Sequence, residues 1–240
     1  MTKKTVDHTV HPTDHEEVHF RGTPVVRDIV IGLSDGLTVP FALAAGISGA
    51  VSNAHLVVAV GLAEIAAGSI SMGLGGYLVA STESEHYRAE LGREMRETEV
   101  VPEREAQEVA QIFEGYGLRP EEAAPVVRAI RADRKRWIGF MMRFEIGLEE
   151  PDPSRIWRSA LTIALSYVAG GLIPLLPYMI ASKVRTALLF SVLVTVLALF
   201  AFGYIKNKII GLRPLRGGIQ TILIGGVAAG AAFLIARLVA

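Results

Sequence analysis

Five long stretches of this chain are almost entirely apolar. They are residues 29–50, 56–80, 159–180, 187–205 and 218–239. An α-helix needs about 20 consecutive apolar residues to cross the hydrocarbon core of a bilayer. A helix on the surface of a soluble bundle keeps a polar face, and these stretches have none. The pattern therefore predicts an all-α membrane protein with five transmembrane helices per subunit.

Polar segments alternate with these stretches and divide the chain into four parts. We predict a polar N-terminal tail (1–28), two transmembrane helices (29–81), a helical domain outside the membrane (82–157) and three further transmembrane helices (158–240). The domain between spans 2 and 3 is thus an insertion into a membrane bundle.

The inserted segment is predicted to be helical throughout. A stripe of glutamates from Glu83 to Glu97 continues the helix of the second span beyond the membrane. Pro102 and Pro120 are typical first residues of helices. Asp133 is a typical N-cap for a last helix before the third span.

Composition excludes several classes of protein. The chain has 24 Lys/Arg and 24 Asp/Glu, is 51% hydrophobic and contains no cysteine. Disorder over the whole chain requires low hydrophobicity and high net charge. A disulfide scaffold and a cysteine-based zinc finger both require cysteine. Zero net charge argues against a nucleic-acid partner.

The distribution of charge predicts the orientation of the spans. Residues 82–157 hold 12 Lys/Arg and 17 Asp/Glu, whereas residues 158–240 hold 8 Lys/Arg and no acid. Basic residues also flank the first span and the turn between spans 4 and 5, and such flanks mark the cytoplasmic side. We therefore expect the N-terminus and residues 82–157 to be cytoplasmic.

Two acids lie within the predicted spans. Residues 29–81 contain Asp35 and Glu64 but no Lys or Arg. A charge in mid-membrane is costly unless it faces a cavity or a partner, so the natural partner is a proton or a cation. Met72 adds a thioether, which suits a late first-row divalent ion better than Mg²⁺ or Ca²⁺. The alternatives are protonated acids that hydrogen-bond between helices, and a methionine that only packs.

A second group of candidate ligands lies in the inserted domain. Two glutamate pairs are spaced three residues apart, so each pair shares a helix face, and a Met-Met-x-x-Glu segment lies on the last helix. Convergence of these side chains would form a divalent-metal site, whereas a solvated acidic face is the alternative. The residues are Glu94, Glu97, Glu105, Glu108, Met141, Met142 and Glu145.

Two histidine patterns are further candidates for metal sites. Four histidines of the tail (His8, His11, His15, His19) share a face if the tail is helical, but a disordered tail is the alternative. The motif Glu83-x-x-His86 resembles half of a di-iron carboxylate motif. Because no bundle with four inward carboxylates is evident, we predict neither an enzyme nor an organic cofactor.

Four segments resemble the vacuolar iron transporter family. They are residues 26–42 (VRDIVIGLSDGLTVPFA), 61–78 (GLAEIAAGSISMGLGGYL), 140–153 (FMMRFEIGLEEPDP) and 170–178 (GGLIPLLPY). The resemblance covers the chain from about His19 to the C-terminus, in order and without large gaps.

The resemblance implies a homodimeric Fe²⁺/H⁺ exchanger that moves iron out of the cytoplasm, into a vacuole or across the cell membrane. It implies that Asp35, Glu64 and Met72 belong to the transport pathway. It also implies that the seven residues of the inserted domain bind metal. Zn²⁺, Mn²⁺ and Co²⁺ are expected as less selective cargo. The alternatives are a membrane-anchored metal sensor or storage protein, and a membrane ferroxidase.

Overall fold

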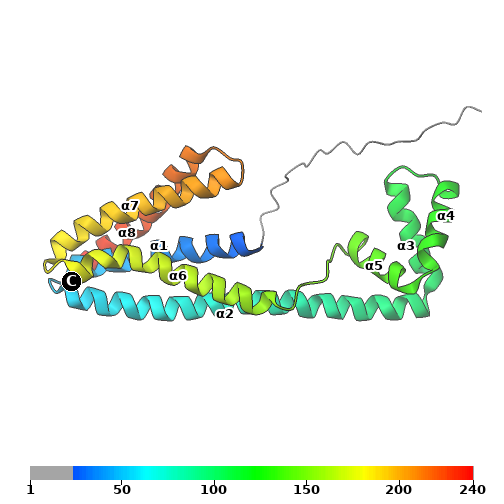
Figure 1. Cartoon of the computed structure of the whole chain (residues 1–240), viewed down its shortest axis with the longest axis horizontal. Helices are drawn as coiled ribbons and strands as arrows, with labels where there is room; N and C mark the ends of the chain where they lie inside the picture. Colours follow the sequence, from blue (N-terminus) through cyan, green and yellow to red (C-terminus); the bar gives the residue numbers. More distant parts are fainter. Residues whose placement is uncertain (1–23, 240) are drawn as a thin grey trace, which may run out of the picture.

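The computed structural model describes residues 24–239, and these residues form eight α-helices and no strand (Figure 1). The helices are α1 (Pro24–Ala50), α2 (Ala54–Val100), α3 (Pro102–Gly115), α4 (Pro120–Arg131), α5 (Arg134–Phe144), α6 (Arg155–Ile180), α7 (Val184–Ile209) and α8 (Pro214–Val239).

Five of these helices are long and apolar enough to cross a membrane: α1, α2, α6, α7 and α8. The predictions of an all-α protein and of five spans are confirmed. Helix α1 begins at Pro24, a few residues before the predicted first span, so the end of the predicted polar tail is helical. The histidines of the tail lie outside the described residues.

Helix α2 connects the two parts of the molecule. It runs without interruption over 47 residues, about 70 Å, which is more than twice the thickness of the hydrocarbon core. Figure 1 shows α1, α6, α7 and α8 along one half of α2, and α3, α4 and α5 gathered at its other end. The prediction that the second span continues into the inserted segment is confirmed.

The membrane helices approach closely where glycines face a neighbour. Helix α6 packs against both α1 and α2. A Cβ atom at Gly36 would overlap the carbonyl oxygen of Tyr167, and a Cβ atom at Gly68 would overlap the Tyr167 hydroxyl. Small residues permit this contact, which places Tyr167 of α6 between the two helices that carry the membrane acids.

The inserted segment forms a small helical unit with its own core. Pro102 and Pro120 begin α3 and α4 as predicted. The Asp133 carboxylate accepts a hydrogen bond from the Arg136 N–H at 2.9 Å and caps α5. The core is apolar and includes one of the candidate ligands; its buried members are Ala106, Val109, Val127, Ile130, Trp137 and Met141.

Candidate functional site

One buried tyrosine, Tyr167 of α6, contacts Glu64 and packs against α1, the helix that carries Asp35. Asp35 of α1 and Glu64 of α2 are both half-buried. The Tyr167 hydroxyl donates a hydrogen bond to Glu64 Oε1 and lies within electrostatic reach of Asp35. Three helices therefore bring two acids and a hydroxyl together inside the predicted membrane region.

The charge of this group is not balanced by the described residues. Glu64 Oε2 is buried without a hydrogen-bond partner, and the membrane segments 29–81 contain no Lys or Arg. A buried carboxylate oxygen without a partner is costly, and either a proton or a cation would offset that cost. The arrangement fits a site that exchanges one for the other.

Met72 lies on α2 two helical turns beyond Glu64. Eight residues of helix separate them by about 12 Å along the axis. A bound ion cannot contact both side chains within one subunit, because metal–ligand bonds are close to 2–2.5 Å. If Met72 is a ligand, it binds the ion at a different point along the pathway. Its role as a ligand stays a prediction.

The sequence leaves Asp28 open between a functional acid on the face of Asp35 and an exposed or capping acid, and the structure shows it buried; Tyr167 is a new candidate residue. Asp28 is 2% exposed, and its Oδ1 atom lies 3.5 Å from Arg27 Nε without a hydrogen-bond partner. Seven residues, or two turns, separate it from Asp35 on the same face of α1, and this spacing was visible in the sequence. Tyr167 gave no such signal, because one tyrosine in an apolar span is ordinary.

Replacement of Tyr167 with Phe is expected to slow metal flux several-fold while the fold is retained. The change removes the hydroxyl that orients Glu64 and leaves a second carboxylate oxygen unpaired. The matched control is Tyr178→Phe, because Tyr178 lies on the same helix and its buried hydroxyl bonds Ser48 at 2.8 Å. Flux into proteoliposomes over a range of pH measures the effect. Equal flux in wild type and Tyr167→Phe would contradict the assigned role.

A second group of acids lies where α2, α3 and α5 meet. Carboxylate oxygens of Glu94, Glu97 and Glu105 lie within 4.8 Å of one another, and so do those of Glu105, Glu108 and Glu145. Glu105 belongs to both groups. The five predicted glutamates are therefore brought together by the fold, and we call these five residues the glutamate cluster.

The inner members of the glutamate cluster are buried and incompletely bonded. Glu94 and Glu105 are 1% and 2% exposed, and each has a buried oxygen without a hydrogen-bond partner. Burial and then the charge of Glu145 raise the pKa of Glu94 to about 7. Burial and then the charge of Glu108 raise the pKa of Glu105 to about 7. A divalent cation would remove both costs, because it supplies charge and accepts oxygen ligands.

The outer members are partly neutralised by arginine. Arg93 Nε lies 3.6 Å from Glu97 Oε2, and Arg104 Nε lies 3.2 Å from Glu108 Oε1. Both arginines are substantially exposed, so these pairs contribute little to stability. The negative charge that these two pairs do not neutralise lies at the buried residues Glu94 and Glu105.

The two methionines of the inserted domain have different surroundings. Met141 is buried in the apolar core beside Ala106, the neighbour of Glu105. Met142 lines a cavity of about 560 Å³ with Leu91 and Met95 of α2. The sequence suggested one site for both residues, but the structure points them at different neighbours. Their role as metal ligands stays a prediction.

The stability of the metal-free protein is expected to fall as the pH rises from about 4.5 to 7. The pKa of Glu94 is higher in the folded state than the ordinary value of 4.5. The folded protein therefore binds more protons than the unfolded one in this window, and it loses that advantage as the pH rises. Thermal unfolding of the full chain with a chelator should show the midpoint falling by a few degrees.

The variant Glu94→Gln isolates this effect from other titrating groups. It should be more stable than wild type at pH 7.5 and should show a weaker dependence on pH. Glu114→Gln changes an exposed glutamate of α3 and should behave like wild type. An unchanged slope in Glu94→Gln would refute the assignment.

The di-iron motif is not assembled in the described residues. Glu83 Oε2 lies 3.1 Å from Arg155 Nη1, and His86 is exposed. An arginine beside the carboxylate disfavours a metal ion at that position. This arrangement gives no support to the ferroxidase alternative.

The chain is similar to members of one protein family over almost its whole length. Residues 26–237 match the model of the VIT family. Vacuolar iron transporter 1 of Oryza sativa subsp. japonica is 54% identical over 239 residues, which cover 100% of this chain and 94% of that protein. Vacuolar iron transporter 1 of Arabidopsis thaliana is 54% identical over 94% of this chain and 90% of its own length. Protein CCC1 of Saccharomyces cerevisiae is 40% identical over 89% of this chain and 69% of its own length. The rice match extends through the N-terminal tail, further than the resemblance noted from the sequence.

Proposed function

The chain belongs to the VIT family, and on this basis we propose that it moves Fe²⁺ out of the cytoplasm into a vacuole in exchange for protons. The names of its relatives support iron as cargo and the vacuole as destination. The observation that carries the exchange is the pair of membrane acids, Asp35 and Glu64, which lie in segments 29–81 without Lys or Arg, with Glu64 bonded to the Tyr167 hydroxyl.

The exchange follows from the chemistry of these acids. In a poorly solvated site, a carboxylate is stable when it binds either a proton or a cation. Fe²⁺ that arrives from one side displaces protons, and protons that arrive from the other side displace Fe²⁺. A proton gradient across the membrane then drives iron in the opposite direction. Mn²⁺, Co²⁺ and Zn²⁺ are expected as weaker cargo, since similar oxygen and sulfur ligands bind them.

We propose that the inserted domain is cytoplasmic and captures the ion before transport. The basic flanks of the spans support this orientation. The glutamate cluster offers two overlapping groups of three carboxylates, and the continuous helix α2 joins it to Glu64. Metal that binds Glu94 and Glu97 is therefore bound to the same helix that carries Glu64.

We propose that the protein functions as a homodimer. Asp35 and Glu64 remain half-exposed in the single chain, and ionisable groups within a membrane face a protein interior or a water-filled cavity instead of lipid. A second subunit against α1 and α2 would provide such an interior.

Flux measurements in proteoliposomes test the proposal. Vesicles that contain the full chain and a metal-sensitive dye should take up Fe²⁺ when a pH gradient is imposed, and the internal pH should change in step. A membrane-anchored sensor would bind metal without flux. A ferroxidase would consume O₂. Iron uptake that is independent of the pH gradient would disprove the exchange mechanism while leaving iron transport intact.

A further inference from the structure

A groove remains open between α1 and α7 near the end where α1 begins. It has a volume of about 430 Å³ and is walled by apolar side chains of the first half of α1 and the second half of α7. Leu37 of α1 and Ile173 of α6 also line it, and Lys206 is the charged residue among its lining residues. Residues 26–37 of α1 give it a length of about 16 Å.

The occupant of this groove should be apolar. Figure 1 shows α7 and α8 inclined away from α1 toward the turn that joins them, which leaves this side open. The segment that precedes α1, residues 1–23, carries 4 Asp/Glu, 3 Lys/Arg and 4 His. Such a polar segment does not match apolar walls. The surrounding medium of a membrane helix offers a better match, because it consists of acyl chains.

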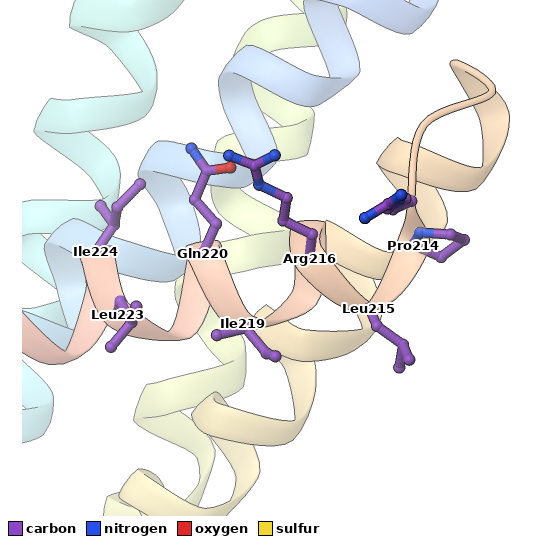
Figure 2. Close-up of a pocket in the computed structure, with 8 residues that line it drawn as sticks. Pro214, Leu215, Arg216, Ile219, Gln220, Leu223 and Ile224 are labelled. Carbon is purple, nitrogen blue, oxygen red and sulfur yellow. The ribbon is translucent and has the colours of Figure 1, made fainter.

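Lys206 lines the groove, and further basic residues follow it closely in the sequence. Lys206 and Lys208 lie in the last turn of α7, and Arg213 and Arg216 lie at the start of the adjoining helix α8. Figure 2 shows a separate hollow along α8, where Arg216 and Gln220 point to the same side of the helix. Residues 158–240 contain no acid. Within residues 24–239, none of these four side chains forms an ion pair.

The turn that carries these side chains is held by its own hydrogen bonds. Asn207 Nδ2 donates to the Arg213 carbonyl oxygen at 3.2 Å, and the Leu212 N–H donates to the Asn207 carbonyl oxygen at 2.8 Å. Gly211 supplies the positive φ of +79° that the turn requires. The basic groups therefore start from a fixed backbone, which lowers the entropy lost on binding.

We propose that this groove binds an anionic phospholipid, with one acyl chain between α1 and α7 and the phosphate headgroup at Lys206. Basic residues at the ends of spans are common signals of topology. What distinguishes Lys206 is the apolar groove that it lines, whose length equals about half of the 30 Å hydrocarbon core. Basic pockets between membrane helices are suited to anionic headgroups.

Native mass spectrometry of the full chain with defined lipids tests the proposal. Phosphatidylglycerol should remain bound at least about tenfold more tightly than phosphatidylcholine. Lys206→Gln should remove most of this preference. The matched control is Lys183→Gln, because Lys183 lies at the opposite end of the same helix, and it should retain the preference.

A second variant tests the position of the acyl chain. Ala201 lines the groove, and Ala201→Phe should reduce the binding of both lipids by filling it. Ala198, one turn earlier on α7, also lines the groove. If Ala201→Phe does not fold, Ala198→Phe is the variant to use in its place. Inorganic phosphate should not compete, which separates a lipid site from a phosphate site. Equal binding of the two lipids by wild type would overturn the proposal, as would an equal loss in Lys206→Gln and Lys183→Gln.

Discussion

Replacement of Asp35 with Asn is expected to lower pH-gradient-driven Fe²⁺ flux at least about tenfold. A loss of only ~1.4 kcal/mol of binding free energy for the ion corresponds to a factor of ten. Asparagine has nearly the same shape as aspartate, but it carries no charge and takes up no proton. The variant therefore loses both the attraction for Fe²⁺ and the group that returns a proton. Asp35 sits beside Gly36, whose close contact with Tyr167 fixes α1 against α6, so the backbone should be unaffected.

The matched control for this change is Asp152→Asn. Asp152 is an exposed acid of the segment between α5 and α6, where it accepts hydrogen bonds from Ser154. Its replacement should reduce local order but not the flux. Both proteins should elute and unfold like wild type in detergent. Full flux in Asp35→Asn, with a normal dependence on the pH gradient, would remove Asp35 from the proposed mechanism.

The sequence predicted the membrane architecture well, because its signals are local. A run of apolar residues is sufficient to identify a span, and a proline or an N-cap aspartate is sufficient to begin a helix. The starts of α3 and α4 at Pro102 and Pro120, and the cap at Asp133, followed from such signals. None of them depends on which helices are neighbours.

Contacts between distant helices were harder to predict. Tyr167 reaches Glu64 across 103 positions of sequence, and this contact depends on the absence of a side chain at Gly68. The burial of Asp28 likewise depends on packing that no single segment encodes. The spacing of glutamates predicted which residues share a helix face, but it did not predict that Glu105 would contribute to two groups at once.

Met141 and Met142 illustrate the same limit within one helix. Adjacent residues of a helix point about 100° apart, so they seldom contribute to one site. The structure places Met141 in the core that α5 shares with α3 and α4, and it places Met142 in a cavity lined by α2. The two adjacent methionines of this motif therefore contact different parts of the inserted domain.

Replacement of Glu105 with Gln is expected to lower the affinity of the inserted domain for divalent metal by about 100-fold. Removal of groups that only orient a metal ligand already costs about 10–100-fold, and Glu105 contributes an oxygen to both groups of the glutamate cluster. Glutamine keeps the volume of the side chain but removes its charge, so both groups lose a ligand together. Glu97→Gln affects one group and should cost less.

Isothermal titration of the full chain with Mn²⁺ or Co²⁺ measures the difference without the oxidation that complicates Fe²⁺. Glu114→Gln is the matched control, because Glu114 is an exposed glutamate of the same helix, α3, and should bind like wild type. The metal-free Glu105→Gln protein should also be more stable at pH 7.5, since a buried glutamine carries no charge to desolvate. This gain separates loss of a ligand from loss of the fold: a variant that binds weakly because it is unfolded would be less stable. Wild-type affinity in Glu105→Gln would show that the cluster is an acidic surface and not a metal site.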